Sequence, residues 1–133
     1  MSPSYVMPLD LKTVLNSSFL TGIFILPSTS KEQFPFLQEV LQADAAHMSF
    51  GKYTLYSVYG TNVNGTMSAL GFALLFGNED KQSWTQFWNF IKKTHPTINQ
   101  SKYTIITNQD KGSLSALEEV VPLAGRFLCS FHH

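Results

Sequence analysis

The sequence predicts a mixed α/β domain, in which a mixed sheet is flanked by helices in the order β-β-β-α-β-α-β. The first observation is a series of three strand-like runs joined by short links, at about 40–47, 53–63 and 66–77. The second run is rich in β-branched and aromatic residues, and Asn64-Gly65 after it is a strong hairpin signal. The second observation is that helix-like and strand-like segments alternate downstream, which predicts parallel strands with right-handed crossovers. Together they predict an antiparallel meander continued by parallel strands.

Upstream of the meander the signals are weaker. Residues 1–18 are polar, contain two prolines and are predicted as a loose lead-in. An apolar run predicts a strand at 19–26. Two serines can cap a short helix at about 30–39, and Pro35 keeps that helix from being long.

The downstream elements carry clearer start and stop signals. Asp80 can cap a helix at about 81–94, which has one apolar stripe and ends before Pro96. The stripe residues, which we interpret as core, are Trp84, Phe87, Trp88 and Ile91. The remaining predicted elements are a strand at 103–108, a helix at 112–121 and a last strand at 126–133.

Composition limits the class of protein. The 133 residues suffice for one domain with a substantial core. Only 14% of residues are charged, so we expect part of the surface to be apolar, as in a piece of a larger protein or a face covered by a partner. Nine Lys and Arg residues balance nine Asp and Glu residues, which counts against strong autonomous DNA binding.

Cysteine usage and hydropathy indicate the compartment. The single cysteine, Cys129, excludes an internal disulfide and favours a reducing, intracellular compartment. The first residues carry no basic run, so we expect no signal peptide. The longest apolar stretch, 19–27, is far too short to cross a bilayer, so we expect no membrane association.

One carboxylate stands in the middle of the apolar run at 40–47. Asp44 is surrounded by valine, leucine and alanine residues. An ionised carboxylate is costly to remove from water unless a cation or hydrogen-bond donors meet it. Two interpretations follow: Asp44 is a ligand of a divalent metal, or it accepts backbone N–H groups at a strand end.

Five short motifs, in order, resemble the transposase domain of Mutator-like elements (MULE), of the ribonuclease H-like superfamily. The similarity spans about 19–133. The similar segments are Asp44-Ala-Ala-His47, Gly71-Phe-Ala-Leu-Leu75, Glu79 with Ser83-Trp84 and Phe87, Ile106-Thr-Asn-Gln-Asp-Lys-Gly112, and Cys129-x-x-His132.

The resemblance implies a nuclear function in DNA transposition. In this family an acidic triad and two metal ions cleave and transfer DNA strands, with DNA as the partner of the full-length parent. Mg²⁺ or Mn²⁺ would be the cofactor, because hard ions prefer carboxylate oxygens. Asp44 corresponds to the first acid, and the strand at 103–108 would bring its C-terminal end beside it.

The sequence departs from the family pattern at the later acids. The second acid position holds Asn108, whose amide oxygen can touch a metal but brings no charge to bridge two. Asp110 would lie about 6.5 Å further along an extended strand, on the same side. It is a substitute ligand or, as we favour, the N-cap of the 112–121 helix. The third acid lies beyond the Cys-x-x-His motif, so we expect a domain truncated before it, and one that does not cut DNA by itself.

Zinc binding at the end of the chain is a further hypothesis. Cys129 and His132 are suitable zinc ligands, with His133 beside them, but a closed site needs four. On a regular strand their odd spacing would also put Cys129 and His132 on opposite faces. We favour Cys129 as a small buried hydrophobic residue.

A second function class remains open. Asn108, zero net charge and low charge density also fit a non-catalytic, domesticated descendant of a transposase that binds a protein partner. Binding of Mg²⁺ or Mn²⁺ through Asp44 would discriminate between the two classes.

Overall fold

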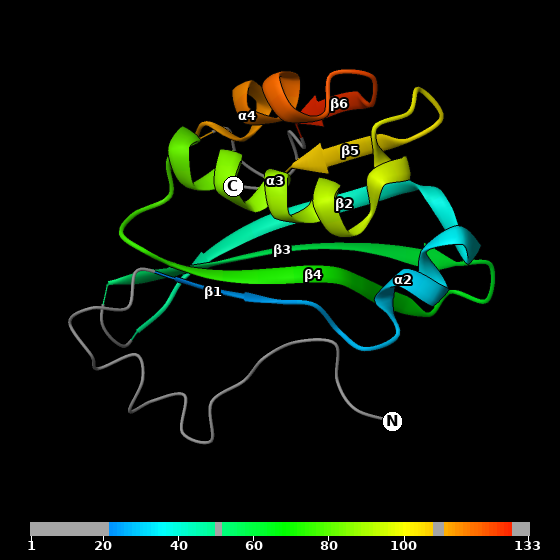
Figure 1. Cartoon of the computed structure of the whole chain (residues 1–133), viewed down its shortest axis with the longest axis horizontal. Coiled ribbons are helices and arrows are strands. Elements are labelled where there is room, and N and C mark those ends of the chain that lie inside the picture. The colour runs from blue at the N-terminus through cyan, green and yellow to red at the C-terminus, as the bar shows by residue number, and fades with distance from the viewer. Residues whose placement is uncertain (1–21, 50–51, 108–110, 129–133) are drawn as a thin grey trace.

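The computed structural model describes residues 22–49, 52–107 and 111–128, and these form one six-stranded mixed sheet with helices on one face (Figure 1). The strand order across the sheet is β1-β4-β3-β2-β5-β6. The strands are β1 (Gly22–Ile25), β2 (Leu37–His47), β3 (Tyr53–Asn62), β4 (Met67–Phe76), β5 (Thr104–Thr107) and β6 (Gly125–Leu128). The helices are α2 (Ser30–Gln33), α3 (Lys81–Thr94) and α4 (Ser113–Val120), with 3-10 turns η1 (Phe34–Phe36) and η2 (Pro96–Ile98).

The topology confirms the predicted fold class. Strands β2, β3 and β4 form the antiparallel meander, and β1 adds to its outer edge. On the other side of β2 the pairing becomes parallel, first with β5 and then with β6. Helices α3 and α4 are the crossovers that return the chain to the same end of the sheet. This arrangement fits the ribonuclease H-like fold that the resemblance implies.

The first helix and the first meander strand differ from their predicted bounds. A helix was expected over 30–39, but α2 ends at Gln33, η1 follows, and β2 begins at Leu37. Pro35 lacks the N–H that a longer helix needs, and Leu37 is extended, with φ −80° and ψ 151°. Leu37 then pairs with Asn62 at the far end of β3, which extends β2 to 11 residues.

The hairpin between β3 and β4 forms at Asn64-Gly65, as predicted. It is wider than a two-residue turn, because the backbone N–H of Asn62 donates to the carbonyl of Thr66 at 2.9 Å. The side chain of Asn62 also accepts from the N–H groups of Asn64 and Thr66. Gly65 has φ +86°, a conformation that favours glycine.

Helix α3 forms over the predicted residues. The side chain of Asp80 accepts from the backbone N–H of Ser83 at 2.8 Å, which caps the helix as expected. All four stripe residues are buried in the main core. The ring of Trp84 packs edge-on against that of Tyr56 in β3, with the ring centroids 4.8 Å apart. The stripe therefore fixes α3 to the middle of the sheet. None of the described helices is long and apolar enough to cross a membrane.

The start of α4 corrects a prediction. The N-cap position is taken by Gly112, with φ +96°, and not by Asp110, which lies outside the described residues. A Cβ at Gly112 would stand 2.3 Å from the backbone nitrogen of Lys81, so only glycine allows α4 to begin against the start of α3. The surface ion pair between Lys81 and Glu119 spans the same helix pair. The predicted lead-in at 1–18 lies outside the described residues and stays a prediction.

Replacement of Gly112 should destabilise the fold more than replacement of Gly65. Both glycines have positive φ, which costs an alanine about 1–2 kcal/mol, but a Cβ at Gly65 would meet no atom within 4 Å. We expect Gly65→Ala to lower the free energy of unfolding by that amount. Gly112→Ala should lower it by about 1–3 kcal/mol more, because the new Cβ clashes with the Lys81 backbone. Urea unfolding of the two variants measures the difference, and equal losses would contradict the close helix contact.

Candidate functional site at the ends of the central strands

Asp44 lies near the C-terminal end of β2, on a central strand of the sheet. Strand β2 is antiparallel to β3 on one side, where Asp44 pairs with Ser57. On the other side it is parallel to β5, and Ala43 pairs with Thr107. The residue before Asp44 is therefore in register with the last described residue of β5. The arrangement expected from the sequence, an acid beside the end of a parallel neighbour strand, is present.

The alternation of side chains along β2 gives the sheet two different faces. Leu41 and Ala43 point into the main core beneath α3 and α4, whereas Gln42 and Asp44 point to the opposite side. We call this opposite side the Asp44 face. By strand register it carries Val40, Gln42, Asp44, Ala46, Leu55, Ser57, Tyr59, Phe72, Leu74, Thr104, Ile106 and Phe127. Among the described helices, none packs against the Asp44 face (Figure 1).

The carboxylate of Asp44 is half-buried and has few fixed partners. Its Oδ1 accepts a hydrogen bond from the backbone N–H of the next residue, Ala45, at 2.8 Å. Its cross-strand neighbour Ser57 shares a hydrogen bond with Tyr59 of the same face, at 3.3 Å. Within the described residues no Lys, Arg or His pairs with Asp44. Among the described residues, this local backbone bond uses only part of the acceptor capacity of the carboxylate.

Four other predicted site residues lie outside the described residues. They are Asn108, Asp110, Cys129 and His132. The described residues contain no group of three His, Cys, Asp or Glu side chains that could hold a metal ion. The metal and zinc predictions that involve these four residues therefore stay predictions.

Two acids that the sequence analysis did not assign to the site are engaged on the surface. Glu118 of α4 lies 3.8 Å from Arg126 of β6, and Glu119 of α4 lies 3.3 Å from Lys81 of α3. Surface ion pairs of this kind contribute little to stability. Both carboxylates are already engaged with a basic side chain of the protein.

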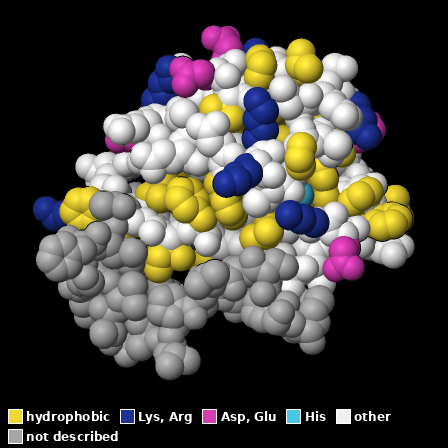
Figure 2. Space-filling model, viewed as in Figure 1, with side chains coloured by type: hydrophobic (Ala, Val, Ile, Leu, Met, Phe, Trp, Pro, Cys, Tyr) yellow, Lys and Arg dark blue, Asp and Glu magenta, His cyan; other side chains and the backbone are white. Residues whose placement is uncertain are grey.

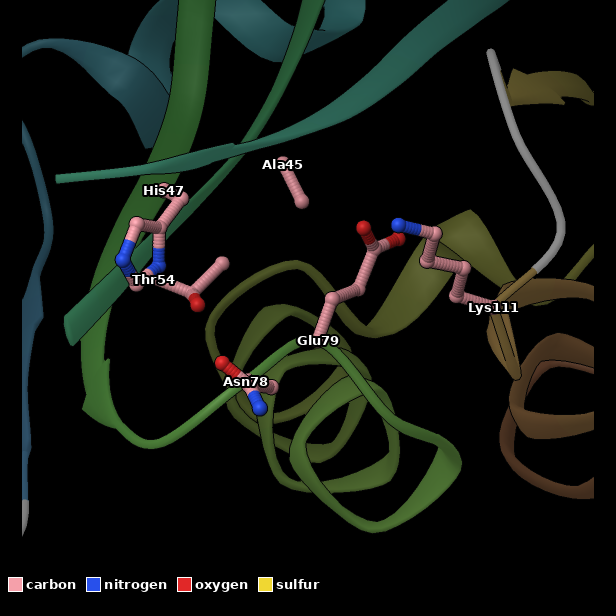
Figure 3. Close-up of a pocket in the computed structure, with 6 residues that line it drawn as sticks. All are labelled: Ala45, His47, Thr54, Asn78, Glu79 and Lys111. Carbon is pink, nitrogen blue, oxygen red and sulfur yellow. The ribbon is translucent and has the colours of Figure 1, made fainter. Parts of the chain in front are cut away.

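A pocket of about 440 Å³ lies at the same end of β2, on the side of the sheet that faces α3 (Figure 3). It is lined by Ala45, His47, Thr54, Asn78, Glu79 and Lys111. Sequence reasoning did not predict this pocket, because its walls come from β2, β3, the β4–α3 link and the β5–α4 link. Three of the segments that resemble the family contain pocket residues, namely Ala45 and His47, Glu79, and Lys111.

Two contacts hold the walls of this pocket in place. The indole Nε1–H of Trp84 donates to the Glu79 carboxylate at 2.8 Å. The hydroxyl of Thr54 donates to the carbonyl of Gly77 at 2.7 Å. Next to the pocket, Tyr56 of β3 pairs with the pocket residue Ala45 of β2. Burial raises the pKa of the Tyr56 hydroxyl to about 12. Tyr56 is therefore a neutral core residue at physiological pH.

Comparison with known families agrees with this geometry. A model of the MULE transposase domain matches residues 40–133, more than half of the chain. The match begins inside β2, four residues before Asp44, and includes β3, β4, α3, β5, α4 and β6. A search of the curated proteins finds no match.

If Asp44 serves a site and not the fold, its replacement should stabilise the domain. We expect Asp44→Val to raise the free energy of unfolding by about 1 kcal/mol, because valine suits a half-buried strand position better than a carboxylate does. Gln42→Val, two residues away on the same face, is the control, with a change within about 0.5 kcal/mol. Urea unfolding measures both, and a loss of stability in Asp44→Val would assign Asp44 a structural role.

Proposed function

The chain belongs to the MULE transposase domain family, and on that premise we propose that it is a DNA-handling domain of the ribonuclease H-like type. The family chemistry is metal-dependent cleavage and transfer of DNA strands. We propose further that this chain keeps the first carboxylate of that site, Asp44, but does not cut DNA by itself.

The observation that carries the proposal is the position of Asp44. Its carboxylate lies on the central strand, one residue past the pairing of Ala43 with Thr107, and points to a face on which no described helix packs. Strand β5 ends at Thr107 beside Ala43, whereas β2 continues to His47, so we propose that a DNA strand approaches the Asp44 face next to the end of β5. Carboxylates at such strand ends can act as ligands for the hard divalent ions of phosphoryl-transfer enzymes.

The small number of metal-ligating side chains limits the metal chemistry that this site can support. The described residues supply one carboxylate to a metal, which fits one ligand of an ion but not a complete site. Hard divalent ions are usually held by several oxygens, and two ions need bridging charge. Asn108 contributes an amide in place of the family's second acid. The loss of that charge supports weak metal binding without cleavage.

DNA binding by this domain is proposed to be weak and sensitive to salt. Nine basic residues are balanced by nine acidic ones. On the face drawn in Figure 2, hydrophobic side chains are visible between the charged ones. Affinity for phosphate backbones rises with the number of Lys and Arg contacts, so a balanced surface supports few of them.

Metal binding through Asp44 tests the proposal directly. With a dissociation constant of about 1 mM, 10 mM Mn²⁺ stabilises a protein by about 1.4 kcal/mol, or about 5 °C in melting temperature at this chain length. We expect this shift in the parent chain and its loss in Asp44→Asn. Glu39→Gln, which removes an exposed carboxylate from the same strand, should keep the shift. A parent chain that does not respond to metal would contradict the proposed site.

Cleavage is tested separately with supercoiled plasmid DNA. We expect no nicking above background when the chain is incubated with plasmid and Mn²⁺, because the second acid position carries no charge. Agarose gel electrophoresis separates nicked from supercoiled plasmid. Nicks that appear with the parent chain and vanish in Asp44→Ala would show an active nuclease and contradict the proposed inactivity.

A second candidate function is a non-catalytic module that binds a protein partner. The observation in its favour is that Val40 and Phe127, both on the Asp44 face, are 47% and 63% exposed. Apolar side chains that stay exposed on a sheet face are typical of interaction surfaces. The absence of any metal response, together with retained folding, would favour this second function over the first.

A further inference from the structure

The pocket in Figure 3 lies directly beside Asp44, across the sheet. Ala45 follows Asp44 on β2 and its methyl group lines the pocket, so the carboxylate and the pocket lie on opposite faces at consecutive residues. The two lie on either side of the sheet, so one DNA strand reaches both only by passing around the edge of β2 beyond Ala43, where none of the described strands pairs with that side of β2.

The charges of the pocket disfavour an ion as its ligand. Figure 3 shows the carboxylate of Glu79 and the ammonium group of Lys111 pointing toward one another from opposite walls. Lys111 would repel a metal cation, and the described residues contain no metal-binding group of three. Glu79 would repel a phosphate. The pair together favours a neutral ligand that has both donors and acceptors.

The remaining groups fit a planar heteroaromatic ligand. His47 is exposed and offers a flat ring at the mouth of the pocket, and exposed Asn78 offers an amide that donates and accepts. Glu79 and Thr54 are fixed by their bonds to Trp84 and Gly77, so these walls are already ordered. A volume of about 440 Å³ is within the range of small-ligand pockets and accepts a nucleobase.

We propose that this pocket receives one unstacked nucleobase of a single-stranded DNA segment whose backbone runs past Asp44. The inference rests on the proposed function, since it requires the domain to handle DNA. Asn78 and the pair formed by Glu79 and Lys111 contact the edge of the base, and His47 stacks on its face. Unstacking costs least in single strands and at frayed ends, so the pocket selects such DNA over an intact duplex.

The experiment uses the parent chain and a dye-labelled single-stranded oligonucleotide that carries 2-aminopurine at one position at a time. Fluorescence anisotropy of the dye reports DNA binding, and 2-aminopurine emission reports unstacking of that base. We expect binding at low salt, with emission rising at one position. Asn78→Ala and His47→Ala should remove that rise and weaken binding about fivefold, the equivalent of one lost stacking or polar contact of about 1 kcal/mol.

Matched controls and distinct readouts separate the possible failures. Asn64→Ala, an exposed asparagine in the hairpin at the opposite end of β3, should leave both signals unchanged. Binding with unchanged emission at every position, or a rise that survives in both pocket variants, would overturn the nucleobase pocket and leave the proposed function standing. An anisotropy signal that never changes would contradict DNA handling itself, and with it the pocket. Thermal melting verifies that each variant is folded, and Asn78→Ala tests the pocket if His47→Ala does not fold.

Discussion

The position of β2 between an antiparallel and a parallel neighbour is the constraint on which the rest of the structure depends. Parallel pairing with β5 requires the chain to cross from the end of β4 back to the start of β5, and α3 makes that crossover. The buried aromatic stripe of α3 fixes the crossover to the sheet, with Trp84 against Tyr56 of β3. As a result β5 ends beside Ala43, at the end of the sheet that carries both Asp44 and the pocket.

The alternation of side chains along β2 places apolar residues on one face of the sheet and the carboxylate on the other. Along β2 the side chains of Ala43 and Ala45 face the helices, and Asp44 between them faces away. A shift of one residue in the pairing of β2 would bury the carboxylate under α3 and expose the alanines. The apolar residues around Asp44 therefore do more than pack: they specify the register that keeps the acid outside the core. This is why a carboxylate in an otherwise apolar strand is compatible with a stable sheet.

The sequence was sufficient where several local signals agreed. Helix α3 was predicted at its observed bounds, because Asp80, the four-residue stripe and Pro96 each indicate the same segment. The fold class followed from the order of elements. The missed features depend on contacts between distant segments. Strand β2 begins early because Leu37 pairs with Asn62, and α4 begins at Gly112 because that glycine lies against Lys81. The pocket was missed for the same reason, since its six residues come from four parts of the chain.

The position of Asp44 in the sheet and the total negative charge around it depend on different features of the chain, so one can change without the other. The pairing of β2 with β5, in the register that the apolar residues of β2 specify, fixes the position of Asp44 beside β5. Charge, by contrast, depends on single residues, and an amide at position 108 removes one negative charge with almost no change in side-chain volume. A hard divalent ion responds to that difference strongly, because its binding free energy comes from anionic oxygens. A domain of this family can thus keep its fold when a charged position near the strand ends is replaced, because packing maintains the fold whereas the charge depends on single side chains.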